Sequence, residues 1–212
     1  MNELEIPRMA DVPLDLDAVD RRLADMRQHS IDVVNWPAFD YRPCVTFAIG
    51  YGGGDLCVRF AVEEDAVLAE KTETNASVCQ DSCVEMFIAP SPDAYFNFEF
   101  NCIGTALVGH GPERQGREPL APAIIERIRR RSSLGSTPFP ERKEHTTWYL
   151  TAAIPLELLG LSESSLPGHT CRANWYKCGD RLSEPHYLSW NPITTPRPDF
   201  HCPECFGCVR FL

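Results

Sequence analysis

Residues 80–104 read QDSCVEMFIAPSPDAYFNFEFNCIG and hold the clearest structural pattern of the chain. In the second half of this stretch, Phe96, Phe98 and Phe100 alternate with polar residues. Side chains along a β-strand point alternately to its two faces, so this segment predicts a strand with one aromatic, buried face and one polar face. The break at 89–93 contains proline, serine and aspartate, which predicts a hairpin with the preceding strand.

The polar face of this hairpin is the main candidate ligand site. It carries Asn97, Glu99 and Asn101, and Glu85 lies on the neighbouring predicted strand. A sheet does not need such a row of amides and carboxylates for its stability. Planar donors and acceptors repeated at about 7 Å along a strand suit the hydroxyl groups of a sugar.

Two later segments add candidates to the same site. The strand predicted at 171–178 carries Arg172, Asn174 and Tyr176 on one face, and His201 lies in the segment before the last strand. The histidine either orients a turn or faces the ligand. We include these four residues with the hairpin residues as the predicted ligand-binding set.

The remaining segments predict a single all-β domain over residues 1–212. Residues 1–28 form an extended lead-in (1–13) and an amphipathic helix (15–28), in which apolar residues recur at steps of three and four. Residues 132–143 read as a loop, and 155–159 as a short helix that starts at a proline and ends before a glycine. The other predicted strands are 31–36, 44–51, 55–62, 66–69, 105–108, 123–131, 147–154, 186–190 and 206–212. So many short strands predict a two-sheet antiparallel β-sandwich.

Charge and hydropathy restrict the partners that we expect. The formal net charge is −10, and binding to nucleic acid or to an anionic membrane requires clustered basic residues, so we expect neither partner. No apolar run approaches the ~18 residues of a membrane span. The first residues lack the basic and apolar segments of a secretory signal, so the expected location is the cytoplasm.

Ten cysteines are an unusual feature of this composition. Without an export signal, free buried thiols are the default expectation. Cys202, Cys205 and Cys208 recur at steps of three next to a histidine and are therefore candidate metal ligands. Zinc is not expected there, because a structural zinc site usually has two CxxC motifs and the sequence has no separate second one to pair with Cys202 and Cys205.

Several motifs in order resemble the family 9 carbohydrate-binding modules, especially the family-9-like bacterial proteins that occur as stand-alone chains. They are QDSxVE at 80–85, the aromatic strand at 95–101, Ile154-Pro155, Asn174, LSW at 188–190 and DFHxPExFG at 199–207. The resemblance spans residues 30–212. It implies a jelly-roll-like β-sandwich that binds the ends of sugar chains, by hydrogen bonds and by stacking between two tryptophans, with structural calcium nearby. Asp81 with Glu63, Glu64 and Asp65 would be the carboxylates for calcium.

The correspondence with the family's sugar-binding residues is partial. Glu85 and Asn101 match a sugar-bonding glutamate and asparagine, whereas Glu99 stands where the founding modules carry an arginine. Val78 is the residue nearest to the first stacking tryptophan, and Phe200 or His201 lies in the place of the second. Both stacking tryptophans are therefore missing.

Three functions remain open at this stage. The sequence favours non-catalytic carbohydrate binding, with a mono- or oligosaccharide as the partner. The alternative is a glycoside hydrolase-type enzyme or a metal-binding sensor on the same sandwich. In the hydrolase, Glu85 and Glu99 would act as a carboxylate pair. A partner-binding domain that has lost its sugar is the third possibility.

Overall fold

The computed structural model describes residues 1–10 and 15–212, and the strands of these residues form a nine-stranded, a five-stranded and a two-stranded sheet. The nine-stranded sheet, here called the larger sheet, has the order β1-β16-β14-β7-β8-β9-β10, and β3 joins it through β15, which pairs with β14. Its strands are β1 (Glu3–Ile6), β3 (Val33–Val34), β7 (Cys83–Ser91), β8 (Ala94–Asn101), β9 (Ala106–Gly111), β10 (Glu118–Pro119), β14 (Thr170–Cys178), β15 (Tyr187–Ser189) and β16 (Gly207–Phe211).

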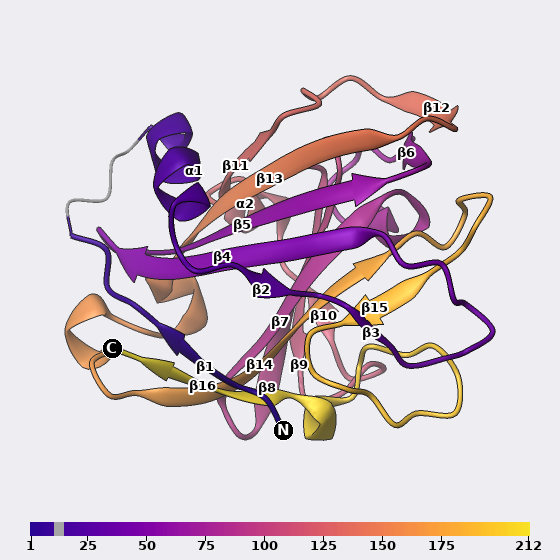
Figure 1. The fold of residues 1–212 in the computed structure, drawn as a ribbon. Helices are drawn as coiled ribbons and strands as arrows, with labels where there is room; N and C mark the ends of the chain where they lie inside the picture. Colours follow the sequence, from indigo (N-terminus) through magenta and orange to yellow (C-terminus); the bar gives the residue numbers. More distant parts are fainter. Residues whose placement is uncertain (11–14) are drawn as a thin grey trace.

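The five-stranded sheet, here called the smaller sheet, packs across the larger one (Figure 1). Its order is β11-β13-β5-β4-β2, built from β2 (His29–Ser30), β4 (Cys44–Gly52), β5 (Asp55–Glu64), β11 (Arg129–Ser132) and β13 (Thr146–Pro155). The hairpin between β4 and β5 turns at Gly53 and Gly54, which have φ of 60° and 84°, a region that glycine enters without strain. A two-stranded sheet pairs β6 (Val67–Ala69) with β12 (Phe139–Arg142).

The core between the two sheets confirms the predicted sandwich. Phe98 and Phe100 of β8 are fully buried there, as the alternation predicts. Phe47 of the smaller sheet stacks on Trp175 of the larger sheet, with ring centroids 4.3 Å apart and planes 13° apart. The polar residues of β8 therefore face the opposite side of the larger sheet.

Helix α1 (Leu16–Ala24) covers the outer face of the smaller sheet, where Val19 and Leu23 pack against Cys57 (Figure 1). The Asp15 side chain caps its first turn. The helix ends four residues earlier than predicted, because the Gln28 side chain donates to the carbonyls of Leu23, Ala24 and Met26. The other helical turns are α2 (Pro122–Ile125), η1 (Val78–Gln80), η2 (Leu156–Leu159), η3 (Glu163–Ser165) and η4 (Pro203–Cys205).

Three predicted segments differ in the structure. Residues 123–131 do not form one strand: α2 starts with Pro122 at its first position, where a proline fits a helix, and β11 begins only at Arg129. The predicted loop at 132–143 contains β12. Residues 3–6 of the lead-in form β1, which pairs in parallel with β16, so the first and the last strand of the chain lie side by side (Figure 1). Residues 11–13 of the lead-in fall outside the described residues.

Across residues 1–10 and 15–212, no helix has the length and apolar character needed to cross a membrane.

Candidate functional site

Two glutamates lie side by side on the larger sheet, on the face turned away from the inter-sheet core. Glu85 of β7 and Glu99 of β8 are direct partners in the antiparallel register. Their alternating neighbours Met86 and Phe98 point into the core, so both carboxyl groups emerge on the outer face. Loops cover this face, and the two side chains are only 2% and 6% exposed.

The two carboxyl groups meet at a cavity of about 210 Å³, here called the carboxylate pocket. Four loops surround it: the one before β7, the one after β9, the one after β14 and the one before β16. Its lining is Ser77, Cys79, Glu85, Glu99, Leu107, Arg114, Arg117, Cys178, Asp180, Tyr187, Pro198, Asp199, Phe200 and His201. Two larger cavities, of about 610 and 500 Å³, lie elsewhere and contain neither glutamate.

Burial controls the protonation of this glutamate pair. It raises the pKa of Glu99 above the ordinary carboxyl value, and it raises the pKa of Glu85 further because the charge of Glu99 adds to the desolvation. Asn97 partly offsets the shift at Glu99, since its Nδ2 donates to Oε1 of Glu99 at 2.8 Å. The two neighbouring carboxyl groups therefore hold protons at a higher pH than exposed glutamates.

Two arginines place positive charge beside the acidic side chains of the pocket. Arg114 forms an ion pair with Asp199 at 3.3 Å, and Arg117 lies near enough to Glu99 to favour the ionised form of its carboxyl group. The ordered loop that carries Asp199 also positions His201: the Asp199 carboxylate accepts from the His201 backbone N–H at 3.0 Å. Burial and the two arginines lower the pKa of His201 to about 3, so its ring is neutral near pH 7.

An aromatic wall closes one side of the carboxylate pocket. Phe200 stacks on Tyr176, with ring centroids 4.3 Å apart and planes 10° apart. Tyr187 meets Phe200 edge-on and hydrogen-bonds Asp180. His201 is held by the Tyr95 hydroxyl at 2.9 Å from its Nδ1. The pocket thus combines fixed ring faces with carboxylate and guanidinium groups.

Comparison with known proteins assigns the chain to a family. The sequence matches the profile of "Carbohydrate-binding family 9" over residues 17–211. The protein belongs to carbohydrate-binding family 9. The match covers nearly the whole chain, so the resemblance expected from the motifs is confirmed. Among curated protein sequences, none matches this family 9 chain.

Solved structures agree with this assignment. This family 9 protein is similar to the structure of a "putative carbohydrate-binding protein" from Bacteroides uniformis, with 37% identity, a TM-score of 0.93 and 99% of both chains covered. It also shares its fold with a family 9 module from Caldicellulosiruptor kristjanssonii. The glucose complex of that module has 13% identity and a TM-score of 0.63, with 100% of this chain and 96% of that chain covered. The cellotriose complex has 11% identity and a TM-score of 0.62, with 99% and 93% covered.

The predicted ligand-binding residues of this family 9 protein divide into two groups. Glu85, Glu99 and His201 line the carboxylate pocket. Asn97 stands behind Glu99 and fixes its carboxylate. These four residues come together in the structure as a connected site.

The other four predicted residues do not line the pocket, because each binds the protein's own backbone. Asn101 bonds Lys71 O and the Asp81 carboxylate, and Arg172 donates to the carbonyls of Glu204 and Phe206. Asn174 bonds the backbone of Asn191 through both of its amide atoms. The Tyr176 hydroxyl donates to Phe200 O. Buried polar groups require such partners, so a polar face does not by itself identify a ligand site.

Sequence reasoning missed most of the residues that line the pocket, and the majority of these lie in loops. They are Ser77, Cys79, Leu107, Arg114, Arg117, Cys178, Asp180, Tyr187, Pro198 and Asp199. Loops carry no periodic signal, and only the DFHxPE motif marks one of them. Phe200 and His201 lie in the place of the second family tryptophan, and both line the pocket. Val78 is the first residue of η1 and its side chain is fully buried, so it offers no stacking surface.

The metal candidates from the sequence do not come together. Cys202 and Cys205 form a disulfide, which corrects the expectation of free thiols at these two positions and removes them as ligands beside Cys208. The carboxylates suggested for calcium are dispersed: Glu64 pairs with Lys177, and Asp65 contacts His145. Asp81 accepts hydrogen bonds from the backbone N–H groups of residues 70 and 71. Among residues 1–10 and 15–212, no three of the four suggested acids bring carboxylate oxygens within 4.8 Å of one another, so they do not form one calcium site.

Proposed function

We propose that this family 9 protein binds a carbohydrate in the carboxylate pocket without modifying it. The observation that carries the proposal is the Glu85–Glu99 pair, which is buried yet opens into a cavity walled by charged and aromatic side chains. Burying two neighbouring carboxyl groups is costly unless they find hydrogen-bond partners. Hydroxyl groups of a sugar, which both donate and accept, would supply those partners.

The wall residues support the same class of ligand. The lining includes Arg114 and Arg117, which are hydrogen-bond donors, and Asp180 and Asp199, which are acceptors. Phe200 presents a ring fixed by stacking, and Phe200 or His201 lies in the place of a family tryptophan. Fixed ring faces and planar polar groups together suit a pyranose, which has apolar ring faces and polar edges.

The size of the pocket favours a short ligand. Its volume of about 210 Å³ is below the roughly 300–1,000 Å³ typical of pockets for drug-sized molecules. We therefore propose that one sugar unit, such as the end of a chain, occupies the pocket. Glucose and cellotriose, the ligands of the Caldicellulosiruptor kristjanssonii structures, are the first ligands to test.

Isothermal titration calorimetry with glucose, cellotriose and a panel of other mono- and oligosaccharides tests the proposal. Glu99→Gln keeps the shape but removes the charge. Losing a hydrogen bond to a charged group costs about 1.5–3 kcal/mol, so we expect sugar affinity to fall about 10- to 100-fold. Glu118→Gln, at an exposed position outside the pocket, is the matched control and should bind like wild type.

Two results would contradict the proposal. One is the absence of binding to every sugar at millimolar concentration by folded protein. The other is a measurable affinity that is the same in wild type, Glu99→Gln and His201→Ala. In either case the pocket would not be the sugar site.

The hydrolase alternative is supported by the same carboxylate pair, since glycosidases use two carboxyl groups around the scissile bond. Incubating the protein with the oligosaccharides that bind and measuring new reducing ends distinguishes the two functions. A binding protein leaves the oligosaccharide intact. Release of reducing ends that disappears in Glu85→Gln and in Glu99→Gln would establish the hydrolase instead.

A further inference from the structure

Two cysteine thiols lie beside the Glu85 carboxyl group at the carboxylate pocket. They are separate from the Cys202–Cys205 disulfide. Cys83 of β7 and Cys178 of β14 are direct partners across two antiparallel strands. Glu85 follows Cys83 by two residues, so its side chain emerges on the same face of the strand. The topology thus brings two thiols and one carboxyl group to a single point.

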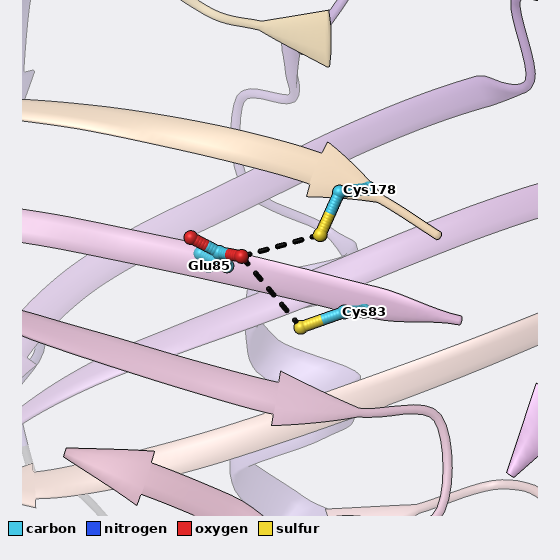
Figure 2. A group of neighbouring side chains, drawn as sticks. All are labelled: Cys83, Glu85 and Cys178. Atoms are coloured by element: carbon cyan, nitrogen blue, oxygen red, sulfur yellow. Dashed lines mark hydrogen bonds between the residues drawn. The ribbon is translucent and has the colours of Figure 1, made fainter. Parts of the chain in front are cut away.

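Figure 2 shows the Glu85 carboxyl group reaching towards both sulfur atoms. Its Oε1 lies 3.2 Å from Sγ of Cys178 and 3.9 Å from Sγ of Cys83. One ligand atom from each of the three residues lies within 4.8 Å of the other two. All three side chains are buried.

We propose that Cys83, Cys178 and Glu85 bind a thiophilic divalent metal ion of the zinc class. Zinc bonds of about 2.3 Å to sulfur and 2.0–2.2 Å to carboxylate oxygen, at tetrahedral angles, place neighbouring ligand atoms about 3.6–3.8 Å apart. The two sulfur–oxygen distances in the structure, 3.2 and 3.9 Å, lie just below and just above that range. Only small side-chain movements separate this arrangement from a coordination sphere.

The surroundings of Glu85 support a cation at this point. Its hydrogen-bond partners among the described residues are the two thiols, which are weak donors. A buried carboxyl group with such weak partners is poorly compensated. A divalent ion between the three groups would neutralise the carboxylate and two thiolates together.

A fourth ligand position would face the carboxylate pocket. Cys178 and Glu85 line the pocket, together with Cys79 and Asp180. Cys79 is more exposed than Cys83 and Cys178. The backbone carbonyl of Cys79 accepts from the Cys178 thiol. The fourth ligand would thus be the Cys79 thiolate, a water molecule or a bound hydroxyl group, and an open position of this kind is typical of functional rather than purely structural zinc sites.

Metal binding by the reduced full-length chain tests the proposal, with Zn²⁺ and Co²⁺ as probes. Binding releases the thiol protons and oxidises nothing. We expect one equivalent of Zn²⁺ per chain, and with Co²⁺ the thiolate-to-cobalt charge-transfer bands and strong visible bands of a four-coordinate ion. Cys178→Ala and Cys83→Ala should lose these bands. Cys57→Ala, which removes a buried thiol on the far side of the smaller sheet, should keep them.

Glu85→Gln keeps the size of the side chain and covers the case in which a cysteine variant fails to fold. Loss of an outer partner of a metal ligand costs about 10- to 100-fold in affinity, so loss of a direct ligand should weaken Zn²⁺ binding at least as much. The proposal is overturned by substoichiometric Zn²⁺ in reduced wild type, by cobalt spectra without thiolate bands, or by bands that persist in Cys178→Ala. A Cys83–Cys178 disulfide in protein that binds no metal after reduction would also overturn it. Each readout is independent of sugar binding.

Discussion

Lys177 and Glu64 form an ion pair that joins the two sheets inside the protein. Nζ of Lys177, on β14, lies 2.9 Å from Oε2 of Glu64, on β5, and both side chains are inaccessible to solvent. Trp148 of β13 donates its Nε1–H to the other carboxylate oxygen at 2.7 Å. His186 accepts from the ammonium group at 2.8 Å. The alternation that places Trp175 in the core also places this lysine there.

Removing one partner of this ion pair should destabilise the fold strongly. Lys177→Met leaves the Glu64 carboxylate buried without its cation, and breaking a buried pair in this way costs about 3–5 kcal/mol. Urea unfolding at pH 7 measures the loss. The double variant Lys177→Met/Glu64→Gln should recover much of the stability, because no uncompensated charge remains. Arg210→Ala, which breaks an exposed pair with Glu5, should change the free energy of unfolding by less than about 1 kcal/mol.

His186 should make the fold sensitive to mild acid. Its Nδ1–H donates to Glu184 O at 2.9 Å, and its Nε2 accepts from Lys177, so the ring is neutral. Burial and the Lys177 charge lower the pKa of His186 to about 2, whereas the unfolded chain protonates this histidine near pH 6.5. The unfolded state therefore binds the proton first, and stability falls as the pH drops from about 6.5 towards 2, by up to about 1.4 kcal/mol per pH unit.

The His186→Gln variant isolates this contribution. Glutamine accepts from Lys177 and donates to Glu184 O without titrating. The free energy of unfolding of the variant, measured in urea between pH 4 and 7, should depend less on pH than that of wild type. Equal slopes for the two proteins would show that His186 takes up its proton at the same pH in the folded and the unfolded state, and would contradict the lowered pKa.

Asn101 should prove structural although its position matches a sugar-bonding residue of the family. Its Nδ2 donates to Lys71 O and to Oδ2 of Asp81, and its Oδ1 accepts from the Thr105 N–H at 2.8 Å. Asn101→Ala leaves these buried groups without a hydrogen-bond partner, so we expect a loss of about 2–3 kcal/mol in the free energy of unfolding. Sugar affinity of the folded variant, measured by calorimetry, should stay within about twofold of wild type. A tenfold loss of affinity without destabilisation would restore Asn101 as a ligand.

Gly109 should control the geometry of the carboxylate pocket without lining it. It lies opposite Asn97 in the register of β8 and β9, and a Cβ at this glycine would be 2.7 Å from Oδ1 of Asn97. Gly109→Ala must therefore displace the amide that holds the Glu99 carboxylate. We expect sugar affinity to fall as it does in Asn97→Ala. The double variant should lose little more, because both changes act through one contact. Additive losses would show that the two residues act separately.

The sequence by itself determined the sandwich and one face of the site. Strict alternation at 96–101 fixed which side chains of β8 enter the core, since the side-chain period of a strand is two. The glycines at 53 and 54 fixed the first hairpin, and the motif series identified the family. The sequence did not predict where the helix ends and the strand begins within 123–131, because the pairing with β13 decides where β11 begins.

Only the tertiary structure decided which polar residues line the cavity. Alternation assigns Glu99 and Asn101 to the same side of β8, yet one lines a cavity and the other holds a loop. The distinction depends on which loops fold over the sheet: the Asn101 amide reaches Lys71 and Asp81, 30 and 20 positions away, and a loop that carries His201 closes the pocket. The same long-range pairing of β7 with β14 placed Cys83 opposite Cys178. Nothing in the local sequence around either cysteine carries that information.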